Sequence, residues 1–120
     1  MKQLERPESE IVREVLRAVN LIPGVRAWRN NTGAVAAEYR GTKRFIRFGA
    51  KGMPDILGWK RTPCVVAGHG VHAILVALEC KRPGQRPTTE QAAFLTAVIA
   101  DGGIGAVVHN AKEAVEALGC

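Results

Sequence analysis

Cysteine is scarce in this 120-residue sequence, and there is no long apolar segment. The three cysteines, Cys64, Cys80 and Cys120, lie far apart and form no Cys-x-x-Cys pair, so neither a disulfide framework nor a zinc site is expected. The longest mostly apolar stretch, residues 64–78, is interrupted by glycine and histidine and is too short to cross a bilayer. The polar N-terminus does not resemble a signal peptide. These absences predict a cytoplasmic protein without a membrane partner.

Acidic residues are also few. There are 11 aspartates and glutamates against 17 lysines and arginines, which gives a net charge of +6 and a pI near 9.7. This excess of cations favours an anionic partner, and nucleic acid is the first candidate, although a basic protein can carry such charge without one. The length fits a single domain, residues 1–120, and an apolar content of 47% is enough for a hydrophobic core.

The apolar pattern predicts a mixed α/β domain in which helices pack on a sheet. Apolar residues spaced by three and four positions indicate helices, and apolar runs bounded by turn residues indicate strands. Residues 72–80 are the most apolar run and are expected at the buried centre of the sheet. Residues 61–70 fit either a strand or a loop. The expected elements are a helix from Pro7 to about Asn20, strands at 25–30, 34–40 and 43–48 with a hairpin turn at Gly41-Thr42, a strand after Asp55, the strand at 72–80, a helix from Thr88 to Gly102, a strand at 104–109, and a helix capped by Asn110 in a capping box with Glu113.

Two short stretches place charged side chains at strand ends. Asp55 begins one apolar strand, and Glu79 and Lys81 end another in the sequence LECK. Because side chains alternate along a strand, Glu79 and Lys81 point to one face and Cys80 to the other. If Asp55 lies at the same edge of a neighbouring strand, two carboxylates and an ammonium meet there, as in a Mg²⁺ or Mn²⁺ site that hydrolyses phosphodiesters. The same charges can also form a solvated strand tip or a simple ion pair.

The ordered combination of these motifs resembles the PD-(D/E)XK nuclease superfamily, and within it the stand-alone virus-type replication-repair nuclease (VRR-NUC) domain. The matching segments cover most of the chain: a glutamate-containing first helix, WRNNTG (28–33), RFGAKGMPDILG (47–58) and LECKRPGQRPTTEQAAF (78–94). The resemblance implies a mixed central sheet flanked by helices in αβββαβ order. It also implies a homodimeric, Mg²⁺- or Mn²⁺-dependent DNA endonuclease, without an organic cofactor, that acts on branched DNA such as four-way (Holliday) junctions.

The resemblance assigns roles position by position. Asp55 and Glu79 match the metal-binding acids, and the backbone carbonyl of Cys80, not its sulfur, completes the metal ligands. Lys81 matches the catalytic lysine, which assists the attack of water on the phosphorus. All four positions therefore belong to one expected active site.

Two further catalytic positions are open to alternatives. Gln91 matches the glutamine on the helix after the ExK motif, but its spacing from Thr88 also fits a capping box. A glutamate on the first helix is either Glu8 or Glu10. Glu8 is preferred because its spacing from Ile11 places it on the apolar, sheet-facing stripe. Either glutamate can instead simply favour the helix N-terminus.

Polar residues on the surrounding loops and strands are candidates for DNA contacts. Lysines and arginines at a strand edge can follow a phosphate backbone, although each can equally be a solvated charge, and asparagines are common turn formers. Trp28 and Trp59 are expected in the core, and His69 and His72 on a loop or surface. The candidate DNA-binding residues are Arg29, Asn30, Asn31, Lys43, Arg44, Arg47, Lys51, Arg82 and Arg86.

Two rival functions remain compatible with the same fold. One is a non-catalytic junction-binding or architectural DNA protein, which the intact set of Asp55, Glu79 and Lys81 disfavours. The other is a sequence-specific restriction-type endonuclease, which usually needs recognition segments for which 120 residues leave little room.

Overall fold

The computed structural model describes residues 6–30, 33–39, 41–48, 51–63 and 70–119. Over these residues the chain forms three helices and six strands. None of these helices has the length and apolar character needed to cross a lipid bilayer. In chain order the elements are α1 (Glu8–Val19), β1 (Val25–Arg29), β2 (Gly33–Tyr39), β3 (Thr42–Phe48), β4 (Ile56–Pro63), β5 (Val71–Cys80), α2 (Thr89–Ala100), β6 (Ile104–Val108) and α3 (Ala111–Ala117).

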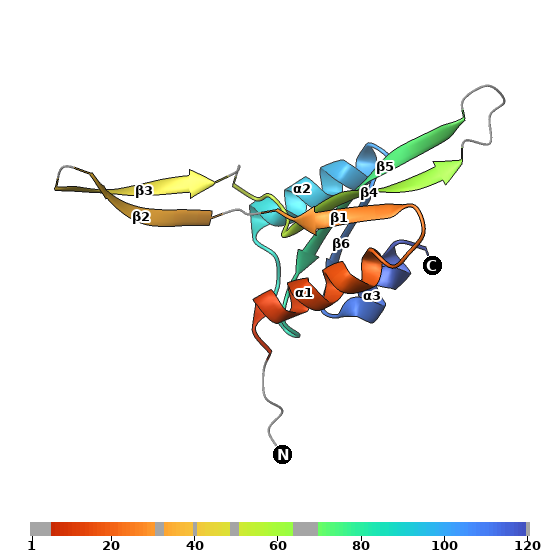
Figure 1. Ribbon diagram of the computed structural model, residues 1–120, viewed down its shortest axis with the longest axis horizontal. Helices are drawn as coiled ribbons and strands as arrows, with labels where there is room; N and C mark the ends of the chain where they lie inside the picture. Colours follow the sequence, from red (N-terminus) through yellow and green to blue (C-terminus); the bar gives the residue numbers. More distant parts are fainter. Residues whose placement is uncertain (1–5, 31–32, 40, 49–50, 64–69, 120) are drawn as a thin grey trace, which may run out of the picture.

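The described strands form one mixed sheet and one separate hairpin. The sheet has the order β1-β4-β5-β6, with antiparallel β1–β4 and β4–β5 pairs and a parallel β5–β6 pair. A parallel pair needs a crossover, which α2 supplies. Strands β2 and β3 pair only with each other and project away from the sheet (Figure 1). The observed order is αβββββαβα, which reduces to the αβββαβ order that the resemblance implies when the hairpin and α3 are set aside.

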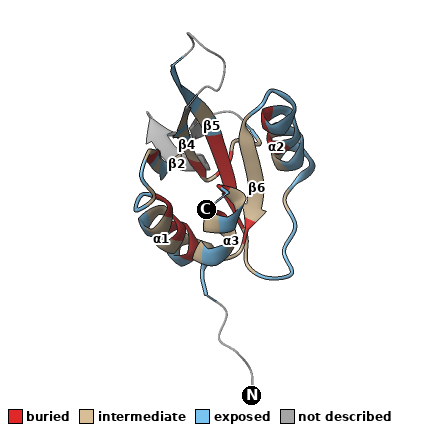
Figure 2. Cartoon of the chain, turned by 90° about the vertical axis from the view of Figure 1, so that its right-hand side faces the viewer, coloured by how far each residue is buried: buried red, intermediate tan, exposed pale blue. Residues whose placement is uncertain are grey.

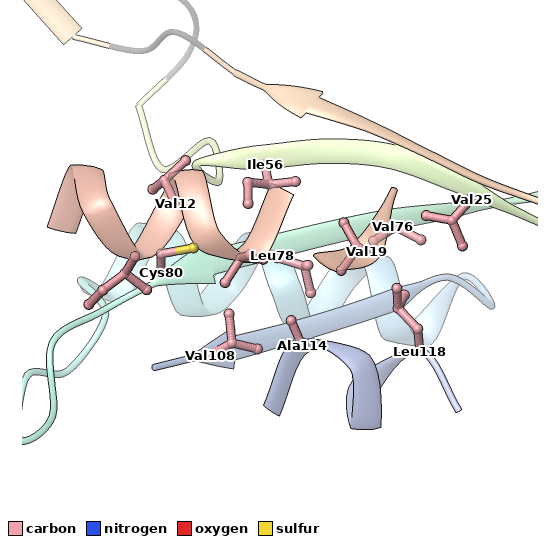
Figure 3. Packing of buried hydrophobic residues seen from close by; sticks show 12 residues of the cluster. Val12, Val19, Val25, Ile56, Val76, Leu78, Cys80, Val108, Ala114 and Leu118 are labelled. Atoms are coloured by element: carbon pink, nitrogen blue, oxygen red, sulfur yellow. The ribbon is translucent and has the colours of Figure 1, made fainter. Parts of the chain in front are cut away.

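Helices cover both faces of the sheet (Figure 2). In β5, Val76, Leu78 and Cys80 pack towards α1 and α3, whereas Ala77 packs with residues of α2. Burial of each Val, Leu or Ile side chain contributes about 1.5–3 kcal/mol, so this alternation fixes which face of β5 meets which helix. Figure 3 shows the larger cluster, whose labelled members are Val12, Val19, Val25, Ile56, Val76, Leu78, Cys80, Val108, Ala114 and Leu118.

Most of the expected elements are confirmed, with small shifts at their ends. The ambiguous stretch 61–70 begins as strand, since β4 continues to Pro63, and residues 64–69 lie outside the described part. Strand β5 is buried only from Val76 to Cys80, because β6 pairs with that half alone. The first half of β5 pairs with β4 and is largely exposed.

Two expectations need correction. Trp28 and Trp59 are not core residues, because 48% and 38% of their surfaces are exposed. At α3, the Asn110 side chain accepts a hydrogen bond from the Glu113 N–H (2.8 Å), as a cap should. The Glu113 carboxylate, however, accepts from the N–H of His109 (3.1 Å), one residue before the cap, so the reciprocal bond of a capping box falls outside it.

Candidate functional site

The pairing of β4 with β5 brings the two predicted acids together. Ile56 pairs with Leu78, and continuing this antiparallel register by one residue places Asp55 opposite Glu79. The Asp55 carboxylate also accepts a hydrogen bond through Oδ2 from the Cys80 N–H, at 2.9 Å. This bond to the β5 backbone fixes the Asp55 side chain at the end of β5.

Glu79 is the most deeply buried charged side chain in the described residues. Only 1% of its surface is exposed, and its Oε2 has no hydrogen-bond partner there. Burial, followed by hydrogen bonding to Asp55 and the negative charge of Asp55, raises the pKa of Glu79 to about 8, against the opposing effect of Lys81. A protonated Glu79 can donate to Asp55, whereas two ionised carboxylates repel. The pair thus needs either a shared proton or a cation.

Lys81 and Glu8 complete the cluster. The Lys81 Nζ lies 3.6 Å from Oε1 of Glu79 and 3.7 Å from Oε1 of Glu8, and its side chain is 13% exposed. Carboxylate oxygens of Glu8, Asp55 and Glu79 all lie within 4.8 Å of one another. Of the two glutamates considered on the first helix, Glu8 thus joins the acids, whereas Glu10 is exposed and lies outside this group.

Gln91 forms the capping box that its spacing allowed and also contacts Glu79, while a catalytic role stays a prediction. Its Oε1 accepts from the Thr88 N–H (2.8 Å) and its own N–H donates to Thr88 Oγ1 (3.2 Å), which forms the capping box of α2. Its Nε2 then donates to Oε1 of Glu79 at 3.0 Å. The cap fixes which end of the amide faces the cluster, so Gln91 holds one Glu79 oxygen and leaves the other without a donor.

Cys80 borders the acid cluster with its backbone, whereas its thiol lies in the core. The side chain lies on the opposite face of β5, buried between α1 and the sheet, and burial raises the pKa of the thiol to about 12. A neutral thiol in an apolar core is inert. The Cys80 N–H bonds Asp55, so its peptide borders the cluster, and ligation through its carbonyl stays a prediction.

Asn30 binds the segment that carries Asp55. Its backbone N–H donates to the Asp55 carbonyl (2.7 Å), and its Nδ2 donates to the Pro54 carbonyl (3.2 Å). Sequence reasoning considered Asn30 a DNA contact or a turn former and missed this bond to the Asp55 segment. The available signal was its position one residue after a strand, but its partner could not be inferred before β1 was known to pair with β4.

Gly52 shapes the loop before Asp55. Its φ is +87°, and a Cβ at this position would lie 2.8 Å from the backbone oxygen of Glu90 in the first turn of α2. Only glycine accepts both conditions without strain. Lys51 beside it forms an exposed ion pair with Glu90, 3.2 Å between Nζ and Oε1. The loop is thereby seated against the helix that presents Gln91.

The other candidate DNA-binding residues are only partly described. Arg29 and Arg86 are exposed, Lys51 is exposed in its pair with Glu90, and Arg82 is half-buried. Contact of these residues with DNA stays a prediction. The remaining predicted contacts lie outside the described residues, either wholly or in their side chains: Asn31, Lys43, Arg44 and Arg47.

The donor set suits a hard divalent cation. Three carboxylates face one lysine, so the cluster has an excess of negative charge, and the buried Oε2 of Glu79 lacks a donor. Oxygen-rich sites of this kind suit Mg²⁺ or Mn²⁺.

Comparison of the chain with models of protein families, with curated proteins and with solved structures gives no match.

Proposed function

We propose that this protein is a divalent-metal-dependent DNA endonuclease with a PD-(D/E)XK core of the VRR-NUC type. One observation carries the proposal: carboxylate oxygens of Glu8, Asp55 and Glu79 gather within 4.8 Å, with the ammonium of Lys81 3.6–3.7 Å from two of these residues. Four side chains from three distant parts of the sequence thus converge. An ion pair at a strand tip does not require such convergence or a carboxylate as buried as Glu79.

The acids are suited to hold the cation. Asp55 is oriented by the Cys80 N–H and Glu79 by Gln91, so neither has to be ordered when a cation binds. A bound Mg²⁺ or Mn²⁺ supplies positive charge that polarises a phosphodiester and lowers the pKa of water. The neutral proton-bound form of Glu79 competes with the cation, so cation affinity should rise with pH.

Lys81 is suited to act on the phosphate. Its side chain is largely buried and its ammonium lies beside two carboxylates, so the charge is held in one place. A fixed, partly desolvated cation stabilises the negative charge that develops on phosphate oxygens as water attacks. The same ammonium can orient that water.

Branched DNA is the proposed substrate, and a homodimer the proposed assembly. The net charge of +6 supports binding to a polyanion. Two copies related by a twofold axis would present two acid clusters, which suits paired cuts in a symmetric four-way junction. Both features come with the nuclease proposal, and the cleavage assay below tests the substrate.

The test is cleavage of a four-way junction, a flap and a linear duplex of matched length, each with Mg²⁺ and with Mn²⁺. We expect junction cleavage by the wild type. Asp55→Asn and Lys81→Ala should each reduce the rate at least about 100-fold while changing DNA affinity less than about threefold. Asp101→Asn and Lys112→Ala are matched controls at exposed positions and should cleave normally.

Each rival has its own outcome in this assay. A non-catalytic junction-binding protein would bind the three DNA substrates without cutting any of them. In that case Asp55→Asn would not alter Mn²⁺ binding measured by titration calorimetry. A restriction-type enzyme would cut the linear duplex at fixed sequences. Full activity in either Asp55→Asn or Lys81→Ala would refute the proposed mechanism.

A further inference from the structure

Two tryptophans form an exposed pair on the sheet. Trp28 of β1 and Trp59 of β4 have ring centroids 5.8 Å apart in an edge-to-face arrangement, and both remain substantially exposed. Helix α2 packs against β5 and β6, and the sheet face around Trp28 and Trp59 stays exposed. Exposure of two large aromatic side chains in contact is costly, because each forgoes the burial that a core position would provide.

The pair lies on the same sheet face as Asp55 and Glu79 of the acid cluster. Along β4, alternation places Leu57 and Trp59 on the side of Asp55, and pairing places Trp28 directly opposite Leu57. Trp59 lies four positions after Asp55, which corresponds to about 13 Å along an extended strand. The indole rings therefore begin within one or two nucleotides' reach of the acids, along a continuous sheet surface.

A polar pocket adjoins this pair. Its volume is about 590 Å³, and Trp59, Arg26 and Arg61 line it together with the turn at residues 20–25. Arg26 and Arg61 are both exposed. Asn20 closes the outer edge of β1 here, because its side chain donates to the Ala27 carbonyl and accepts from the Ala27 N–H. An indole and two arginines that line one hollow offer a stacking surface and two phosphate donors.

We infer that Trp28, Trp59 and this pocket bind an unpaired nucleotide strand on its way to the acid cluster. The inference rests on the proposed nuclease function and adds, among branched substrates, a preference for DNA that exposes a single-stranded segment near the cut. Bases in a duplex are already stacked, so an exposed indole pair gains most from an unpaired base, and the arginines match the phosphates on either side.

A second copy of the chain fits this surface less well. A twofold interface would set the patch against itself, which would bring Arg26 and Arg61 of one copy towards the same residues of the other. Like charges facing each other oppose such an interface. Single-stranded DNA instead neutralises these charges while it covers the indoles.

Tryptophan fluorescence tests the inference directly, because Trp28 and Trp59 are the only tryptophans in the sequence. A single-stranded oligothymidylate, titrated in the presence of a chelator so that no cleavage occurs, should quench the emission, and a blunt duplex of equal length should do so much less. By anisotropy of a labelled oligothymidylate, Trp28→Ala and Trp59→Ala should each weaken binding about tenfold. Their duplex affinity should change less than twofold, and Trp59→Phe should restore part of the loss.

Ile99→Ala is the matched control, since Ile99 is a large apolar residue on α2 that is 56% exposed. It should bind oligothymidylate as the wild type does. Unchanged single-strand affinity in both tryptophan variants, in a protein whose junction cleavage still requires Asp55, would overturn the inference and leave the nuclease intact. A tryptophan variant that turns a dimer into a monomer at unchanged DNA affinity would also overturn it, in favour of a second copy. No DNA binding or cleavage by the wild type would refute the nuclease function itself.

Discussion

Replacement of Glu79 by glutamine should stabilise the metal-free protein, and increasingly so as the pH rises. Gln91 can still donate to the new amide oxygen, and the new NH₂ group can donate to Asp55 as a protonated carboxyl would. The substitution therefore keeps the shape and hydrogen bonds of protonated Glu79. What it removes is the cost of ionising a carboxyl that is 1% exposed and lies beside another acid.

The sign and size of the stability difference between the wild type and the variant follow from the raised pKa of Glu79. The pKa of Glu79 rises from an ordinary 4.5 to about 8 in the folded protein, so the folded state holds a proton that the unfolded state has lost between these values. The wild type is therefore most stable relative to the variant below pH 4.5 and loses that stability as the pH rises through about 8. At about 1.4 kcal/mol per pKa unit, the free energy of unfolding of the variant should exceed that of the wild type by about 3 kcal/mol at pH 7 and about 5 kcal/mol above pH 8.

Urea unfolding at pH 5, 7 and 9 in the presence of a chelator measures this difference. Glu116→Gln is the matched control, because Glu116 is an exposed glutamate on α3. Addition of Mn²⁺ at 100 times its dissociation constant should then stabilise the wild type by about 2.7 kcal/mol and the Glu79→Gln variant by much less. A wild-type-to-variant difference that stays flat from pH 5 to pH 9 would show that Glu79 is not a buried acid beside Asp55.

Three further outcomes are expected. Gly52→Ala should lower the free energy of unfolding by about 3 kcal/mol, because the site combines a φ of +87° with a 2.8 Å approach to the Glu90 backbone. Gly84→Ala is the control, since Gly84 has a φ of +85° but open space around it, and it should lower the free energy of unfolding by about 1 kcal/mol. Equal losses in chemical denaturation would exclude the steric contribution at Gly52. Asn30→Ala should slow junction cleavage without weakening DNA binding, because its amide bonds the Pro54 carbonyl, and a loss of affinity with an unchanged rate would assign Asn30 to DNA instead. DNA affinity should fall at least about 100-fold between 50 and 200 mM salt, as multiple phosphate contacts require, and a flat salt dependence in anisotropy titrations would contradict binding through the backbone.

Much of the secondary structure could be predicted because its signals are local. The Thr88 cap with Gln91, the Asn110 cap, and the glycines after α2 lie within a few residues of the helix ends that they mark. Alternation likewise predicts from neighbouring residues alone that Glu79 and Lys81 share a face. Even a local bond can differ by one residue, since the Glu113 carboxylate bonds the His109 N–H instead of the Asn110 N–H of a capping box.

The sequence by itself determined which side chains are available at the strand ends and which way they alternate. Only the tertiary structure decided that Asp55 stands opposite Glu79 and that Glu8 reaches Lys81, because strand pairing and helix placement join residues far apart in the chain. The exposure of Trp28 has the same origin: a tryptophan in an apolar strand is buried only if another layer covers it, and α2 packs elsewhere on that face. Spacing along a chain is a local property, whereas register, coverage and the low dielectric that raises the pKa of a carboxyl arise only when distant segments meet.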